Sequence, residues 1–347
     1  MTPNISDEQP YCILGAGSSG LAAARHFKDL GIPFECLERE DDVGGNWYYG
    51  RPASSVYAST HTISSKRLTE YRDFPLPEDY PEFPSHRQIH AYLRGYARHY
   101  ELYDHIEFNS EVRSLTPVAE GWSVHLANGA ERTYRGVVIC NGHNWDPRLP
   151  DYPGEFRGPT LHSSEYKTPE VLQDRRVLVV GGGNSGCDLA VEAAVHARRA
   201  LHSTRRAYHV LPKFFRGKPI DECGELLLWM RMPLAVRRLA GAAVSRLVLG
   251  PPARTVMRRL DHRLFETHPV INSQIHHHLG HGRLELRPEI ERLCGETVRF
   301  VDGQEDPIDL ILYATGFKIS FPFIDSTHLN VVDGAPRLYL NVFHPRR

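Results

Sequence analysis

The chain has 347 residues, so it is long enough for two domains with separate cores. Its composition, 41% hydrophobic and 24% charged, is that of an ordinary globular protein. Because 41 basic residues nearly balance 42 acidic ones, no overall positive field would attract nucleic acid, and nucleic-acid binding is disfavoured. The 6 cysteines form no C-x-x-C pair, which argues against a disulfide reductase. No leader-like pattern or run of about 18 apolar residues is present, so we expect a cytoplasmic protein.

The first predicted unit is a βαβ arrangement. An apolar run at residues 11–14 enters GAGSSG, an alanine-rich segment follows to about residue 31, and PFECLERE reads as a second strand. Such a loop places dinucleotide phosphates at a helix N-terminus. Glu38 ends the second strand, where a carboxylate can accept hydrogen bonds from ribose hydroxyls and repels a 2′-phosphate. The pattern therefore predicts that this unit binds FAD or NAD. The GGNW segment fits a close approach of the backbone to the ligand at Gly44 and Gly45.

A second unit of the same kind starts at RRVLVVGGGNSGCDLA. Gly181, Gly183 and Gly186 follow an apolar strand and open another helix, too far along the chain to share one nucleotide site with the first unit. The next strand ends in HSTRR without an acid, and Arg205 and Arg206 follow at once. Guanidinium groups suit a 2′-phosphate, so this unit is predicted to bind NADPH.

Alternating segments after each unit, such as GWSVHLANGAERTY and ETVRFVDGQ, predict antiparallel strands that return to the sheets. The expected fold class is α/β, with two Rossmann-like dinucleotide-binding domains (FAD and NADPH), each with a β excursion, and a discontinuous FAD domain. The predicted limits are 1–153 for the first part of the FAD domain, 154–314 for the NADPH domain with a helical insertion at about 221–280, and 315–347 for the return to the FAD domain.

Seven motifs then follow one another along the chain: GAGSSG with Glu38, GGNW, DFPLPEDYPEF, CNGHNWDPRLP, FRGPTLHSSEY, GGGNSGCDLA and YATGF. In this order they resemble the class B flavoprotein monooxygenases, most of all the flavin-containing monooxygenase (FMO) family. The resemblance implies NADPH- and O₂-dependent oxygenation of a soft nitrogen or sulfur centre of a small molecule through a C4a-(hydro)peroxyflavin. Baeyer–Villiger relatives usually show Trp followed by Pro or Asp where this chain has Tyr166-Lys167, so ketone oxygenation is the alternative.

The loops and the resemblance together assign residues to two cofactors and none to a metal. The expected FAD residues are Gly15, Ala16, Gly17, Ser18, Ser19, Gly20, Glu38, Gly45, Asn46, Trp47, Thr62 and Ile63. The expected NADP residues are Gly181, Gly183, Asn184, Ser185, Gly186, Asp188, Ser203, Arg205 and Arg206. Catalytic candidates are His162, Ile63 and Ser64, with His162 favoured as a hydrogen-bonded structural residue that ties the two domains at FRGPTLHSSEY.

The chain departs from the FMO pattern in two places. The family usually has asparagine before Ser-Ser-Lys, where this chain has Ile63, which cannot donate a hydrogen bond. An uncoupled NADPH oxidase that releases H₂O₂, or a nucleotide-binding remnant, is therefore a further alternative. Relatives also continue with a strand and helix after the position of Arg347, so we expect either a truncated form with weak FAD retention or a differently completed FAD site.

Two partner questions stay open at this stage. Residues 226–263 are arginine-rich and apolar, which predicts either helices packed across the substrate entrance, the favoured interpretation, or a peripheral membrane contact. A homodimer is a further alternative. His276, His277, His278 and His281 point around a helix rather than to one centre, so they are not assigned to a metal.

Overall fold

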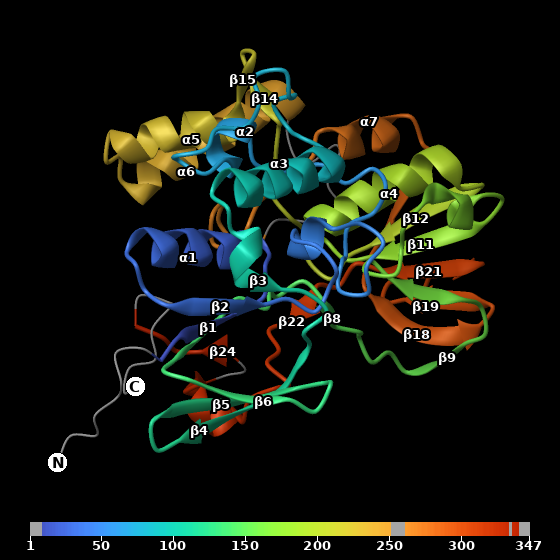
Figure 1. Cartoon of the computed structure of the whole chain (residues 1–347). Coiled ribbons are helices and arrows are strands. Elements are labelled where there is room, and N and C mark those ends of the chain that lie inside the picture. The colour runs from blue at the N-terminus through green and yellow to red at the C-terminus, as the bar shows by residue number, and fades with distance from the viewer. Residues whose placement is uncertain (1–8, 251–260, 333–334, 340–347) are drawn as a thin grey trace. The chain divides into compact units, whose positions relative to one another are not determined.

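The computed structural model describes residues 9–250, 261–332 and 335–339, and Figure 1 shows the path of the chain. The chain forms two compact units. Unit 1 consists of residues 1–56, 85–146 and 317–347, and unit 2 of residues 57–84 and 147–316.

Unit 1 is built on a parallel sheet with the strand order β3-β2-β1-β7. Its strands are β1 (Tyr11–Leu14), β2 (Phe34–Leu37), β3 (Ile106–Glu107) and β7 (Val137–Ile139). Helices α1 (Ser18–Asp29) and α3 (His86–His99) lie on one face. The antiparallel strands β4 (Val112–Val118), β5 (Gly121–Leu126) and β6 (Glu131–Tyr134) cover the other face (Figure 1).

The sequence explains where the helices of unit 1 begin and which face they bury. Ser85 and Gln88 form a reciprocal capping box, so α3 starts with its first backbone N–H groups satisfied. Ile89, Leu93 and Tyr96 then recur at helical spacing and are all buried. On the opposite side of the sheet, alternate residues of β1 pack against the antiparallel strands.

Unit 2 repeats this three-layer plan around a parallel sheet of strand order β10-β21-β11-β12-β17. Those strands are β10 (Thr160–His162), β21 (Leu310–Tyr313), β11 (Arg176–Val180), β12 (Arg199–Ser203) and β17 (Leu284–Arg287). Val177 and Val179 pack on the side of α4 (Asn184–His196) and α7 (Gln274–Gly280). Leu178 and Val180 pack on the side of β18 (Ile290–Gly295) and β19 (Thr297–Phe300), so the strand is buried on both faces.

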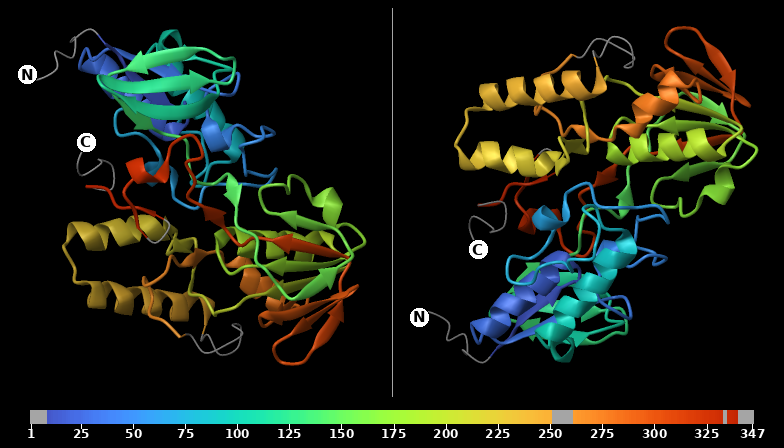
Figure 2. Two further views of the ribbon diagram at one scale, coloured as in Figure 1. Left: turned by 90° about the horizontal axis from the view of Figure 1, so that it is seen from below. Right: turned by 90° about the horizontal axis from the view of Figure 1, so that it is seen from above.

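The remaining elements are shorter or lie in the insertion after β12. In chain order they are η1 (Gly45–Trp47), α2 (Lys66–Thr69), η2 (Tyr103–His105), β8 (Asp146–Pro147), β9 (Gly154–Phe156), η3 (Pro169–Leu172), β13 (Val210–Leu211), β14 (Phe214–Phe215), β15 (Lys218–Pro219), α5 (Ile220–Trp229), α6 (Leu234–Leu249), β16 (Val270–Ile271), β20 (Glu305–Pro307), β22 (Phe317–Lys318), η5 (Ser326–His328), β23 (Val331–Val332) and β24 (Ala335–Pro336). Helices α5 and α6 form an antiparallel hairpin (Figure 2).

The predicted fold class is confirmed, with a β excursion in each unit. The units differ from the predicted domain limits in one long segment and in two short ones, residues 147–153 and 315–316, which were predicted as FAD domain and belong to unit 2. Residues 57–84, predicted as part of the FAD domain, belong to unit 2. The reason is local packing: the buried ring of Tyr57 meets that of Tyr166 edge-on, and the N–H of Ala58 donates to the carbonyl of Lys167. No motif marks these contacts, which join segments about a hundred residues apart in the chain.

Candidate functional site: two glycine loops and the segments around them

The first glycine loop folds so tightly that two of its glycines are required. Gly15 has a φ of +103°, a conformation that side chains rarely adopt. A Cβ added to Gly20 would lie 1.8 Å from the carbonyl oxygen of Gly15. Ser18 and Ser19 are exposed in the first turn of α1, directly beside this turn. The loop thus offers backbone N–H groups and a helix N-terminus to an anionic ligand.

Glu38 braces the same loop from the end of β2. Its Oε2 accepts the N–H of Ala16 at 2.6 Å, and its Oε1 accepts the N–H of Glu40 at 3.0 Å. Burial raises the pKa of the Glu38 carboxyl, and these two backbone N–H groups oppose the rise. The carboxylate has further lone pairs, so it can still accept hydroxyl groups of a ligand.

The GGNW segment meets the first loop backbone to backbone. The N–H of Gly44 donates to the carbonyl of Ala16 at 3.0 Å, and a Cβ on Gly45 would lie 3.0 Å from the Cα of Gly17. Asn46 has a different role, because its Oδ1 accepts both the N–H and the hydroxyl of Ser55 at 2.8 Å. The side-chain oxygen of Asn46 therefore holds the loop that follows GGNW.

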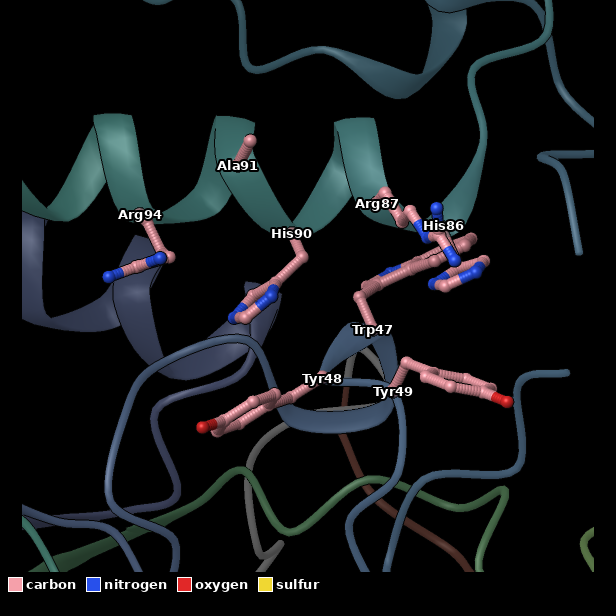
Figure 3. A pocket seen from close by; sticks show the side chains of 8 residues that line it. All are labelled: Trp47, Tyr48, Tyr49, His86, Arg87, His90, Ala91 and Arg94. Atoms are coloured by element: carbon pink, nitrogen blue, oxygen red, sulfur yellow. The ribbon is translucent and has the colours of Figure 1, made fainter. Parts of the chain in front are cut away.

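A pocket of about 220 Å³ adjoins Trp47 in unit 1 (Figure 3). It is lined by Trp47, Tyr48, Tyr49, His86, Arg87, His90, Ala91 and Arg94. The ring of Tyr48 stacks on that of His90, with centroids 4.6 Å apart, and His90 Nε2 lies 2.9 Å from the carbonyl oxygen of Val43. Burial lowers the pKa of His90. Sequence analysis missed this pocket because α3 carries no motif, and only folding brings it to GGNW.

The second glycine loop has the same construction in unit 2. Gly181 has a φ of +131°, and a Cβ on Gly186 would lie 2.1 Å from the carbonyl oxygen of Gly181. That oxygen is also 2.7 Å from Nε2 of His202, a fully buried residue that sequence analysis missed. Burial lowers the pKa of His202 to about 4, so the neutral imidazole donates to Gly181 at physiological pH. His202 is the first residue of HSTRR, but within that segment only Ser203, Arg205 and Arg206 are predicted to bind NADP.

The side chains of two predicted NADP residues, Asn184 and Asp188, form hydrogen bonds with other residues of the protein. Asn184 Oδ1 accepts the N–H of Ile271 at 2.9 Å, and Asp188 Oδ1 accepts Nδ2 of Asn272 at 2.6 Å. Burial raises the pKa of the Asp188 carboxyl, and the Asn272 amide opposes that rise. Both side chains thus fasten the segment before α7 to α4, whereas Ser185 is exposed in the first turn of α4.

The predicted phosphate-binding residues at the end of β12 separate into buried and exposed groups. Ser203 is buried and its hydroxyl donates to the carbonyl of Pro288 at 2.6 Å. Arg205 and Arg206 are exposed immediately after this strand end. Arg206 Nε lies 3.5 Å from Oδ2 of Asp261, which leaves Arg205 as the better placed anion ligand.

The ring of His162 contacts Ser164 and Gly316, which both belong to unit 2, rather than a residue of unit 1 as a tie between the two domains would require. It is buried, its Nδ1 lies 2.9 Å from the hydroxyl of Ser164, and its Nε2 lies 3.1 Å from the carbonyl oxygen of Gly316. Burial lowers the pKa of His162, so its neutral form joins the end of β10 to the end of YATG. Both ring nitrogens are engaged, which suits positioning better than proton transfer.

The segment with Thr62, Ile63 and Ser64 lies in unit 2, whereas Gly15–Gly20, Glu38 and Gly45–Trp47 lie in unit 1. Thr62 is buried, its N–H donates to the carbonyl of Pro84 at 2.9 Å, and its Oγ1 has no hydrogen-bond partner within the described chain. Ile63 is 36% exposed, and the hydroxyls of Ser64 and Thr69 lie 2.7 Å apart.

Within 9–250, 261–332 and 335–339, no three His, Cys, Asp or Glu side chains are grouped as metal ligands. In those same ranges, no helix has the length and apolar character needed to cross a bilayer.

Comparison with known proteins places this geometry in a family. The family model described as Flavin-binding monooxygenase-like matches residues 9–347. Flavin-containing monooxygenase 5 of Rattus norvegicus is 32% identical over 360 residues, which cover 96% of this chain and 66% of the relative. The chain thus spans 66% of the length of this curated relative.

Solved structures are similar in fold. A flavin-containing monooxygenase from Stenotrophomonas maltophilia has a TM-score of 0.72 and 22% identity, covering 95% of this chain and 85% of that one. An open structure of cyclohexanone monooxygenase has a TM-score of 0.69 and 19% identity, covering 90% and 74%. With its two glycine-loop units and this extent of family match, the chain belongs to the flavin-binding monooxygenase-like family.

Proposed function

We propose that the chain is part or all of an NADPH- and O₂-dependent flavin monooxygenase that oxygenates a soft nitrogen or sulfur centre of a small molecule. The observation that carries the proposal is the contrast between the two glycine-loop units. The first ends its second strand in the buried carboxylate of Glu38, and the second ends in the exposed Arg205 and Arg206. A carboxylate suits the ribose hydroxyls of FAD, and arginine suits the 2′-phosphate of NADPH.

The residues present fit both cofactors. The loop Gly15–Gly20 and the first turn of α1 would hold the FAD pyrophosphate, and Glu38 would accept its ribose hydroxyls. The loop Gly181–Gly186 and the first turn of α4 would hold the NADPH pyrophosphate, with Arg205 on the 2′-phosphate. Bound FAD, reduced by NADPH, supplies the oxygen transfer. The side chains then only bind, orient and exclude water, which explains why His162 has no role as a base.

The test is to load the purified chain with FAD and to measure NADPH consumption and products with amines, thioethers and ketones. N-oxides or sulfoxides are expected, whereas esters or lactones from ketones would point to the Baeyer–Villiger alternative. Arg205→Ala should raise the KM for NADPH by about tenfold and leave that for NADH unchanged. Arg206→Ala is the matched control with a smaller effect, because this side chain is shared with Asp261.

The second candidate function is an NADPH oxidase that releases H₂O₂. Ile63 favours it, because an apolar side chain stands where the resemblance expects a hydrogen-bond donor, and it is 36% exposed. Stoichiometric H₂O₂ with no oxygenated product would support this candidate over the first. A chain whose flavin colour NADPH does not bleach in the absence of air would instead be a nucleotide-binding remnant. A cytoplasmic location and a homodimer stay predictions.

A further inference from the structure

Glu192 of α4 joins three parts of unit 2 through one carboxylate. Its Oε2 accepts the hydroxyl of Tyr166, the last residue of FRGPTLHSSEY, and its Oε1 accepts the hydroxyl of Ser59. Glu192 stands two turns after the glycine loop, on the helix whose N-terminus faces the predicted NADPH site. None of the sequence motifs singled out this residue or Ser59.

The surroundings make the two hydroxyl contacts specific. Tyr166 is 1% exposed, and its ring meets that of Tyr57 edge-on with centroids 5.6 Å apart. The N–H of Ala58 donates to the carbonyl of Lys167 at 2.8 Å, so the chain is fixed at Tyr57 and at the residue after it. The start of the segment 59–65 is therefore tied to α4 and to the end of FRGPTLHSSEY at once.

A second carboxylate holds the far end of the segment. Asp221, in the first turn of α5, accepts the N–H of Ser65 through Oδ2 at 2.6 Å. Between Ser59 and Ser65 the chain carries Thr62, which bonds Pro84 through its N–H, and the partly exposed Ile63. The segment is thus held near both ends by acidic side chains of the same unit, and between them Thr62 is buried whereas His61 and Ile63 are exposed.

We propose that Glu192 is a positioning residue that sets the place of segment 59–65 relative to α4. A carboxylate suits this role because each oxygen accepts one hydroxyl, whereas a glutamine side chain has only one acceptor oxygen. Its consequence for catalysis rests on the proposed function, which puts Ile63 and its neighbours beside the reacting cofactors. Through the segment, Glu192 governs how much consumed NADPH ends in product rather than in H₂O₂.

Hydrogen exchange on the purified chain tests the positioning itself. In Glu192→Gln, Tyr166→Phe and Ser59→Ala, the amides of Ala58, Thr60 and Thr62 should exchange at least about fivefold faster than in the wild type. Tyr134→Phe is the matched control. It removes a hydroxyl of equal burial that donates to Glu35 in unit 1, and it should leave these amides unchanged.

A double-variant comparison separates a shared clamp from two unrelated contacts. If both hydroxyls act through Glu192, Ser59→Ala should accelerate exchange in the wild type but add less than about twofold in Glu192→Gln. Unchanged exchange in Glu192→Gln, or full additivity of the two variants, would overturn the proposal. Ser59→Ala, a small change at an exposed contact, keeps the test valid should Glu192→Gln fold poorly.

The catalytic consequence is tested by comparing the product formed per NADPH with the KM for NADPH. Glu192→Gln should lower product per NADPH by about threefold or more and raise H₂O₂ correspondingly, with the KM for NADPH within about twofold. An unchanged product yield would overturn this consequence. If the wild type consumes no NADPH, the proposed function fails, and the exchange experiment still decides whether Glu192 positions the segment.

Discussion

Asp309, at the residue before β21, shows how one carboxylate can fasten two strands of unit 2. It accepts the backbone N–H of Arg176 at 2.7 Å, two hydrogen bonds from the Arg176 guanidinium at 3.0 and 2.5 Å, and one from Arg198 at 3.3 Å. Its hydrogen bonds with the Arg176 side chain lower the pKa of Asp309 to about 2. The pair ties β11 to β21, the central neighbours of the parallel sheet.

We expect Asp309→Asn to lower the free energy of unfolding at pH 7 by about 1–2 kcal/mol. Because the folded-state pKa lies below the unfolded value, the carboxylate stabilises the fold above about pH 4. That contribution is lost as the pH falls from about 4 towards about 2, so the gap between wild type and variant should close there. Urea unfolding followed by circular dichroism measures it. A gap that is constant between pH 7 and pH 3 would show that the charge plays no part.

At Ile63 the expected effect concerns coupling rather than stability. Ile63→Asn restores a side-chain donor at a partly exposed position, so it should raise product per NADPH by about twofold or more. Ile63→Val keeps the apolar character and serves as the control with no gain. Parallel assays of NADPH, H₂O₂ and product give the ratio. Equal ratios for the two variants would show that the residue at 63 does not decide coupling.

At the scale of elements, two glycines at the start of α4 should differ in how their substitution by alanine affects stability. Gly186→Ala would place a Cβ 2.1 Å from the Gly181 oxygen, so we expect a loss of about 2 kcal/mol or more in unfolding free energy. Gly183→Ala meets nothing within 4 Å and has an ordinary negative φ, so the fold should tolerate it. Gly183 is nevertheless exposed in the loop that is predicted to bind the pyrophosphate, so the added methyl group should weaken NADPH binding. Denaturant unfolding and NADPH titration together distinguish the two effects, and equal stabilities would contradict the packing argument.

The same elements show which parts of the site the sequence could predict. Both strand–loop–helix units were predictable, because glycine spacing and apolar runs are local properties of the chain. GGNW predicted a close backbone approach to a ligand, but the contact of Gly45 with Gly17 was not predicted. His202 and Glu192 were not predicted, because the residues that they contact come from distant segments of the chain: Gly181 for His202, and Tyr166 and Ser59 for Glu192.

At the scale of the whole chain, the division into units could be predicted only in outline. The sheets and their β excursions follow from alternation and from the two glycine loops. Residues 57–84 stand between two parts of unit 1 in the sequence, yet they pack in unit 2 through Tyr57, Ser59 and Ser65. Such a crossing depends on tertiary contacts whose partners lie far apart in sequence, which periodicity cannot reveal.

At the same scale, the hairpin of α5 and α6 exposes large apolar side chains (Figure 2). Neither helix has a buried side chain in the structure, and Trp229, Leu239 and Leu247 are 81%, 73% and 79% exposed. These side chains stand among the arginines that sequence analysis noted at residues 226–263, of which residues 251–260 lie outside the described part. Apolar side chains interleaved with positive charge favour contact with an anionic bilayer surface over the packed interpretation.

We therefore expect the chain to sediment with vesicles that contain phosphatidylserine and not with neutral phosphatidylcholine vesicles, and salt should weaken the binding. Replacing Trp229, Leu239 and Leu247 together by Ser should reduce the bound fraction by about tenfold, because burial of large apolar side chains drives insertion. Leu30→Ser is the control, since Leu30 is 72% exposed on unit 1 outside the hairpin. Sedimentation velocity without lipid tests the homodimer alternative. If the wild type is a dimer that binds no vesicles, and the triple variant is a monomer, then these side chains contact a second copy of the chain and not a membrane.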